Sequence, residues 1–413
     1  MTDQPRVAGL PLYFLPFVSA MVGLGPFAID TYLPALPSMA AYFQAGIVAL
    51  NLTVSTYLFG FGIGQLIGGP ISDQIGRKPV GLVGLALFII ATIAIMYSAS
   101  ALEIQILRGL QAIGGGFATV ICNAMVRDAF EPAEAAKRFP MVMLVMLVAP
   151  LIAPVLGSFL MDLGWQAIFV FLGAYALMLM LAFARVPETV AAPTGRISLA
   201  SILPQYLEVL TTRVDGKLIP ARYMAAMGSV GSVMMVFITN SAFIYLEYFD
   251  VGEKWFGVFF GANVLMMMVF SAATTRLIHR VAPHRLFRFG CTLQAVAMGL
   301  LLVLSVTLDM AIWWFTPLLA LCIGAAGMIN PSVSGLFLAH FDRLSGSASS
   351  LMSLTVFMLG ATMGVVSGLF FDGTLVPVVL TMGAAVLTAN LVAFSIPRPA
   401  GFVGAASQPS SAR

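Results

Sequence analysis

The sequence predicts an all-α integral membrane protein with 12 transmembrane helices in two pseudo-symmetric six-helix bundles. Composition, the number of apolar runs and the placement of basic residues lead to this prediction. Of the 413 residues, 60% are hydrophobic and only 9% are charged, whereas a soluble domain carries about 25% charged residues. The mean hydropathy is +1.00. Most of the surface must therefore face lipid.

Twelve apolar runs are each long enough to span a bilayer, which takes about 20 residues. The first six cover 12–34, 48–71, 80–97, 102–125, 141–160 and 167–184, and the second six cover 223–245, 255–275, 287–307, 311–338, 348–370 and 375–396. The longest interruption divides the chain into a bundle over 1–185, a linker over 186–222, a bundle over 223–397 and a tail over 398–413.

The linker and the tail differ in composition. Apolar and polar residues alternate at roughly helical spacing over 198–210, which is typical either of a helix on the membrane surface or of a flexible linker. The tail is rich in Gly, Ala, Ser and Pro, so we expect it to be disordered.

Basic residues orient the spans. The loops on one side hold nearly all the Lys and Arg, and the opposite loops hold only Lys254. Cytoplasmic loops carry such an excess, so both termini are expected in the cytoplasm.

The net charge of +3 is small, and the basic residues are scattered along the chain, which argues against nucleic-acid binding. Three cysteines lie far apart within apolar runs, so we expect packing roles, no metal site and no cofactor.

Two ionisable residues lie at depth within spans, Asp30 and Arg108. Each costs about 2.5–3.5 kcal/mol on insertion scales, so such residues usually face a cavity and find a partner. The first helix runs outward and the fourth runs inward, so both side chains are expected at similar depth near the outer surface. A static ion pair is one interpretation.

Proton coupling is the sharper interpretation. Burial favours a neutral carboxyl group and a nearby guanidinium favours a carboxylate, so small rearrangements can switch Asp30 between the two forms. All three histidines, His279, His284 and His340, fall in loops on the basic side. If protons drive this protein, Asp30 is the strong candidate for their carrier.

Small residues recur every fourth position in two spans. Such stripes let helix backbones approach closely, either as tight static packing or as an interface that slides. One stripe in each half favours a moving interface between the halves. The stripes are Gly60, Gly64 and Gly68 in the second span and Gly360, Gly364 and Gly368 in the eleventh.

The fifth span carries Pro150, Pro154 and Gly157 on a similar period. Prolines remove backbone donors and kink a membrane helix, which is tolerated where neighbours or a cavity satisfy the freed carbonyls.

The loop between the second and third spans carries a fixed pattern of glycines and charges. It resembles the signature loop of the major facilitator superfamily, in which this cluster stabilises the outward-facing state. Gly residues permit close approach, and the acidic residue is expected to cap a facing helix or to pair with Arg127. The matching residues are Gly69, Asp73, Gly76, Arg77 and Lys78.

A narrower resemblance covers nearly the whole chain. Residues 24–34 are similar to the first-helix motif of the twelve-span drug:proton antiporters, particularly the bicyclomycin and chloramphenicol resistance (Bcr/CflA) branch. Arg108, Gln111 and Gly114 match its fourth-helix motif, and 149–157 resembles its antiporter motif. Some relatives carry a second acidic residue in the first helix where Val22 and its neighbours are apolar here. This departure favours neutral, zwitterionic or weakly charged cargo.

The resemblance implies a proton-coupled efflux transporter working by alternating access in the bacterial cytoplasmic (inner) membrane. It is expected to be a monomer and not an enzyme, with protons, the lipid bilayer and a small-molecule substrate as its partners. A lone Asn or Tyr in a span more often makes an interhelical hydrogen bond than binds a ligand, so each lining candidate is individually weak. These candidates are Tyr32, Tyr57, Gln111, Asn123, Asn240, Phe243, Tyr245 and Asn263.

Other functions remain open at this point. The same fold serves exporters of metabolites and proton symporters, with amino acids, nucleosides or siderophores as cargo. A channel predicts flux that needs no proton gradient. A membrane enzyme lacks support because the spans contain no histidine and no catalytic constellation.

Overall fold

The computed structural model describes residues 7, 9–190, 199–278, 280–308, 310–341 and 344–397. Within these ranges, 12 helical segments are long and apolar enough to cross a membrane, which confirms the predicted number of spans. The predicted tail over 398–413 lies outside the described residues.

The first half contains six spans. Its first span is broken into three pieces, and the other five are continuous helices. In order they are α1 (Phe14–Asp30), η1 (Leu33–Ala35) and α2 (Leu36–Tyr42), then α3 (Ile47–Ile75), α4 (Arg77–Met96), α5 (Ala101–Ala129), α6 (Pro132–Leu160) and α7 (Gln166–Ala184), with the short turn η2 (Met161–Leu163) before α7.

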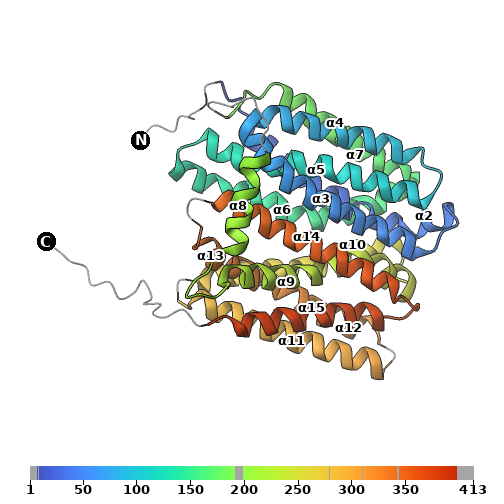
Figure 1. Cartoon of the computed structure of the whole chain (residues 1–413). Helices are drawn as coiled ribbons and strands as arrows, with labels where there is room; N and C mark the ends of the chain where they lie inside the picture. The colour runs from blue at the N-terminus through green and yellow to red at the C-terminus, as the bar shows by residue number, and fades with distance from the viewer. Residues whose placement is uncertain are drawn as a thin grey trace.

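The second half repeats this plan after the helix α8 (Leu199–Thr211). Its spans are α9 (Ile219–Ala242) with η3 (Phe243–Tyr248), α10 (Glu253–Leu277), α11 (Pro283–Thr307), α12 (Ile312–Gly324) with α13 (Ala326–Leu338), α14 (Ser345–Leu369) and α15 (Val376–Ser395). Figure 1 shows α3–α7 on one side of the molecule and α9–α15 on the other.

Prolines and charges place several helix ends differently from the prediction. The helix α6 begins at Pro132 rather than at Met141 and continues through Pro150 and Pro154. Its first turns tolerate Lys137 and Arg138 because both pair with Glu134 on the same helix. The tenth span is interrupted at Ala325, where α12 ends and α13 begins.

The two halves meet along α3 and α14, which run in opposite directions. A Cβ atom on Gly62 would lie 3.1 Å from Cβ of Phe357, and one on Gly69 would lie 3.7 Å from Oγ of Ser350. On another side of the contact, Ser158 Oγ of α6 donates to the backbone oxygen of Glu253 at the start of α10, 2.7 Å away.

The glycine stripe of α3 does not form this interface, and that prediction was wrong. Gly60, Gly64 and Gly68 pack on α5 within the same half, and a Cβ on Gly60 would overlap the carbonyl oxygen of Gly109. A helix has 3.6 residues per turn, so positions 62 and 69 lie on a different face, which is the one turned to α14. The stripe of α14 does face other helices of both halves, since Gly360 contacts Met235 of α9 and Gly368 contacts Val48 of α3.

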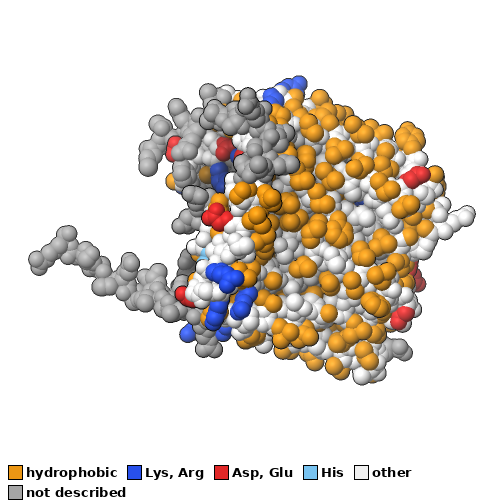
Figure 2. All heavy atoms as spheres, viewed as in Figure 1, with side chains coloured by type: hydrophobic (Ala, Val, Ile, Leu, Met, Phe, Trp, Pro, Cys, Tyr) orange, Lys and Arg blue, Asp and Glu red, His pale blue; other side chains and the backbone are white. Residues whose placement is uncertain are grey.

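One end of the bundle is basic. Arg and Lys stand at the start of α4, in α6 and around α8, and Figure 2 shows them gathered at the end where α8 lies, with a few acidic side chains at the opposite end. We call these the basic end and the acidic end. Figure 1 shows α8 crossing between the halves there. Its Tyr206 and Val209 are buried while Leu203 and Leu207 are exposed, and Tyr206 Oη donates to the Leu66 carbonyl at 2.9 Å.

Candidate functional site

The first span breaks at Asp30, within the motif that the sequence singled out. The helix α1 ends there, and the 3₁₀ turn η1 follows after two residues. The last four carbonyls of a helix lack partners within it and carry its negative dipole end. One of them, Ala28 O, accepts a hydrogen bond of 3.0 Å from Nη2 of Arg108.

Arg108 lies at the centre of a buried network that joins the first-half helices. Its side chain is fully buried, and Nη1 donates to Oε1 of Gln111 at 2.7 Å. The guanidinium carbon stands 4.6 Å from the ring centre of Tyr32 and 4.2 Å from that of Tyr57. Gln111 extends the network to α4, because its Nε2 donates a hydrogen bond of 2.7 Å to Oγ1 of Thr92. The broken end of α1 is thereby fixed to α5 and α4.

Asp30 and Arg108 do not form the expected ion pair. Asp30 is 3% exposed, its Oδ1 has no hydrogen-bond partner, and no ion pair joins it to another described residue. The prediction of a paired carboxylate was therefore wrong for this conformation. The guanidinium instead contacts the helix-end carbonyl, the Gln111 amide oxygen and two aromatic faces, while its Nε has no partner.

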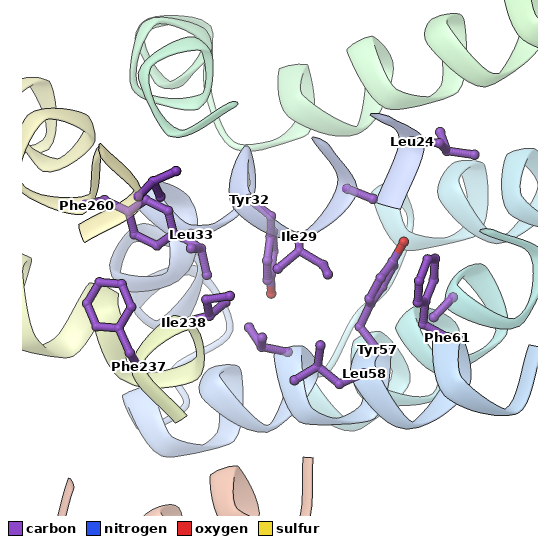
Figure 3. Packing of buried hydrophobic residues seen from close by; sticks show 14 of the residues in the cluster. Leu24, Ile29, Tyr32, Leu33, Tyr57, Leu58, Phe61, Phe237, Ile238 and Phe260 are labelled. Atoms are coloured by element: carbon purple, nitrogen blue, oxygen red, sulfur yellow. The ribbon is translucent and has the colours of Figure 1, made fainter. Parts of the chain in front are cut away.

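Two tyrosines line this region from α3 and from the break in the first span. Tyr32 Oη and Thr53 Oγ1 share a hydrogen bond of 2.9 Å, whereas Tyr57 Oη has no partner. Figure 3 shows Ile29 between the two tyrosines, with Phe237 and Phe260 of the second half beyond them. All five side chains are buried.

The second half contains a similar pair without charge. Tyr245 lies in the π-helical segment η3, a local distortion frequent at functional sites. Nδ2 of Asn263 on α10 donates to its hydroxyl at 3.3 Å. In each half, a tyrosine at the end of the first span thus bonds a polar side chain on the second span. The structure brings together the candidates Tyr32, Tyr57 and Gln111 in one half and Tyr245 and Asn263 in the other.

Three other candidates are not brought into either group. Asn123 is exposed on α5. Asn240 is buried, but its Nδ2 donates to the carbonyl of Val236 on its own helix at 2.9 Å. Phe243 packs on Phe371, with ring centres 4.6 Å apart.

The signature loop lies at the basic end and centres on Arg77. This side chain is 7% exposed. It pairs with Asp73, donates from Nε to Asp128 at 3.1 Å and from Nη1 to Ser72 at 2.7 Å. The expected pair between Asp73 and Arg127 does not form, because Asp73 pairs within its own chain segment and the Arg127 side chain is exposed. The neighbouring Asp128 takes the role of the partner on α5.

Sequence reasoning missed Glu188, which caps the helix that follows the loop. Its Oε1 accepts from the backbone N–H of Arg77 at 2.9 Å and its Oε2 from that of Lys78 at 3.0 Å. A carboxylate at a helix N-terminus is stabilising. Gly76, with φ of 107°, is the preceding residue, and a side chain there would collide with Glu188. No local signal in the sequence links Glu188 to a loop more than a hundred residues away.

The antiporter motif contacts the broken first span. A Cβ on Gly157 of α6 would overlap the carbonyl oxygen of Thr31 and lie 3.1 Å from Pro34. Pro154 and Pro150 stand about one and two turns earlier on the same helix. The motif therefore brings α6 against the segment that carries Asp30. Among the described residues, no three His, Cys, Asp or Glu side chains gather as a metal site requires.

Comparison with known proteins finds relatives that cover most of the chain. The chain is 28% identical over 371 residues to the bicyclomycin resistance protein homolog of Haemophilus influenzae, covering 89% of this chain and 92% of that protein. It is 29% identical over 381 residues to the chloramphenicol resistance protein of Pseudomonas aeruginosa, covering 89% and 88%. The crystal structure of a D-xylose-proton symporter superposes with a TM-score of 0.73 at 16% identity, covering 94% of this chain and 98% of that one, and this likeness concerns the fold alone.

The sequence also matches the Major Facilitator Superfamily over residues 18–365, a range that includes the break in the first span, the signature loop and the antiporter motif. The chain is therefore a member of the Major Facilitator Superfamily.

Proposed function

We propose that this protein exports small neutral or weakly charged amphipathic compounds, such as chloramphenicol-like or bicyclomycin-like drugs, in exchange for protons. The observation that carries the proposal is Asp30, the only Asp or Glu buried among the described residues. It stands where the first span breaks. The names of the bicyclomycin and chloramphenicol resistance relatives support the direction of transport and the class of cargo.

A carboxylate without a cation partner is costly to bury. Protonation of Asp30 therefore changes the stability of this conformation strongly. We propose that the outward-facing protein takes up a proton at Asp30 and then turns inward, where proton release and cargo binding are linked. Two bundles rocking about a central site provide the alternating access. In this structure Arg108 does not pair with Asp30 and instead holds the end of α1 in place.

The cargo class follows from the surroundings of Asp30. Tyr32 and Tyr57 flank Arg108, the buried rings of Phe237 and Phe260 lie beyond them in the second half, and Val22 is buried where a second acid would serve a dicationic drug. Aromatic and aliphatic walls with few polar groups suit an amphipathic ligand. Tyr245 and Asn263 provide hydrogen-bonding groups from the second half.

We also propose that both termini lie in the cytoplasm of a bacterium, because the basic end then faces the cytoplasm. The protein works as a monomer in the inner membrane, with the proton gradient in place of a cofactor. Export of a metabolite and proton symport of an amino acid, nucleoside or siderophore are the alternatives on the same fold.

Substrate-induced proton movement in inverted membrane vesicles tests the proposal. The panel contains chloramphenicol-like, bicyclic-peptide-like, nucleoside and amino-acid compounds. Asp30→Asn removes the proton carrier while keeping the shape of the side chain. Asp162→Asn makes the same change at an exposed acid outside the network and is the matched control.

We expect one class of compound to dissipate an acidic vesicle interior with wild type and with Asp162→Asn, and not with Asp30→Asn. Counterflow of the compound without a gradient should persist in Asp30→Asn, because the cavity and its motion remain. Proton movement by Asp30→Asn at the wild-type rate contradicts the role of Asp30. Dissipation of the gradient in the opposite polarity favours symport over export.

A further inference from the structure

The helix α3 has a second polar face, turned away from Tyr32 and towards the other half. Asn51 and Ser55 lie one turn apart on it, 3% and 0% exposed. A Cβ on Gly364 of α14 would lie 2.7 Å from Oγ of Ser55 and 3.1 Å from Oγ1 of Thr239 on α9. Hydroxyl groups from both halves therefore converge on a glycine at which a side chain would collide with one of them.

The register of α3 against α14 adds a fourth polar residue. Gly368 faces Val48, Gly364 faces Ser55 and Gly69 faces Ser350, so the two helices pair in opposite directions. By this register, Asn51 on α3 and the fully buried Ser367 on α14 both fall within the stretch between the first two of these contacts. We call Asn51, Ser55, Thr239 and Ser367 the polar seam.

Every member of the polar seam has an oxygen without a hydrogen-bond partner. The atoms are Asn51 Oδ1, Ser55 Oγ, Thr239 Oγ1 and Ser367 Oγ. A buried polar atom without a partner is unfavourable, and four at one contact between two halves call for a ligand.

Many other buried hydroxyls in the spans bond their own helix, although Thr316 Oγ1 on α12 also has no partner. Thr274 Oγ1 donates to the Phe270 carbonyl at 2.8 Å, and Ser332 Oγ donates to the Met328 carbonyl at 2.9 Å. The three hydroxyls of the polar seam do not, although a helix offers each of them the same kind of carbonyl. Ser55 Oγ and Thr239 Oγ1 instead lie close to the facing helix α14 at Gly364.

The chemistry of these groups defines what they hold. All four side chains are neutral, so they offer no counter-charge for an ion, and the ion pairs of the described residues lie elsewhere. Hydroxyls both donate and accept, and an amide oxygen accepts. A buried water makes about three hydrogen bonds to such groups and needs little room.

We propose that the polar seam holds ordered water that bridges the two halves of the protein. Water joins α3, α9 and α14 through hydrogen bonds without interlocking side chains. When the halves separate at the polar seam, the polar groups keep water as their hydrogen-bond partner. The contact then opens without leaving buried polar atoms unpaired. This proposal depends on neither the identity of the cargo nor proton coupling.

Thermal unfolding of the purified protein in detergent distinguishes a hydrated seam from a dry one by the sign of the change in the unfolding midpoint. Thr239→Val keeps the shape of the side chain and removes the hydroxyl. If water is bound, its hydrogen bonds are lost and we expect the midpoint to fall by about 2 °C or more. If the seam is dry, an unpartnered hydroxyl is removed and the midpoint should rise. Thr274→Val is the matched control and should change the midpoint by less than Thr239→Val.

A reciprocal exchange tests the position of the water. Ser55→Gly alone removes a hydroxyl, and Gly364→Ser alone inserts a side chain 2.7 Å from Ser55 Oγ, so each is expected to lower the midpoint. The double variant moves the hydroxyl from α3 to α14 and should recover most of the loss. No recovery would contradict a shared ligand between the two positions.

A high-resolution structure of the wild type without cargo gives a direct answer that needs no variant. Density for at least one water within hydrogen-bond distance of Ser55 and Thr239 supports the proposal. Absence of that density overturns it, and so does density that develops only when cargo is present, since the groups would then bind cargo. A rise or no change in the midpoint of Thr239→Val overturns it as well.

Discussion

The guanidinium of Arg108 holds the broken first span through two of its nitrogens. Loss of this two-acceptor geometry should lower the stability of the protein even when the positive charge is retained. The guanidinium reaches Ala28 O with one nitrogen and Gln111 with another, at 3.0 and 2.7 Å, between two tyrosine rings. Arg108→Lys keeps the charge but has a single nitrogen that reaches only one of the two acceptors. The perturbation therefore separates geometry from charge.

The magnitude follows from the contacts that lysine cannot make. One hydrogen bond to a charged group contributes about 1.5–3 kcal/mol, and one contact of a cation with an aromatic face contributes about 0.5–1 kcal/mol. We expect Arg108→Lys to lower the free energy of unfolding by about 2–4 kcal/mol, which is a factor of roughly 30 to 900 in the ratio of folded to unfolded protein.

Denaturation by SDS in mixed micelles measures this difference, and Arg288→Lys is the matched control. Arg288 donates one hydrogen bond, to Ile396 O at 2.7 Å, and lies 5.4 Å from the ring of Phe394. A lysine can reach that single acceptor, so we expect a loss below about 1 kcal/mol. Equal losses at the two positions would refute the reasoning, because the two-acceptor geometry would then contribute nothing.

Two further predictions concern contacts between distant segments. Glu188→Gln keeps the size of the cap but removes its charge from the start of α4, so we expect a loss of about 0.3–1 kcal/mol in the free energy of unfolding at low salt, decreasing as salt is raised; a loss independent of salt would contradict the electrostatic cap. Gly157→Ala places a methyl group against the Thr31 carbonyl, so we expect α6 to move away from the first span and the rate of transport to fall at least tenfold. Gly299→Ala is the control, because a Cβ there meets no neighbouring atom, and this variant should transport normally. Equal transport rates for the two variants would contradict the close contact.

The fold could be read from the sequence because the bilayer restricts what a chain can do. Backbone groups in lipid must bond within their own segment, so apolar runs of sufficient length become helices. Twelve such runs predicted twelve spans, and the structure has them. Helix interruptions were harder to place, since the break after Asp30 and the one at Ala325 depend on neighbouring helices that satisfy the freed carbonyls, as Arg108 does for Ala28.

The candidate site was determined in part. The sequence by itself identified Asp30 and Arg108, because a charge within an apolar run is conspicuous and costly. It also placed Gln111, Tyr32 and Tyr57 on the relevant helices. Asn123 and Asn240 were equally polar and equally deep, and nothing in a linear pattern tells which face of a helix meets which neighbour.

Only the tertiary structure decided who contacts whom. It turned Arg108 towards a helix end instead of towards Asp30, placed Glu188 on a loop far from it in sequence, and brought Ser55 and Thr239 together around Gly364. The physical reason is that composition and spacing fix where a residue lies along its own helix. The partner of a polar atom depends on the packing of helices that are distant in the chain.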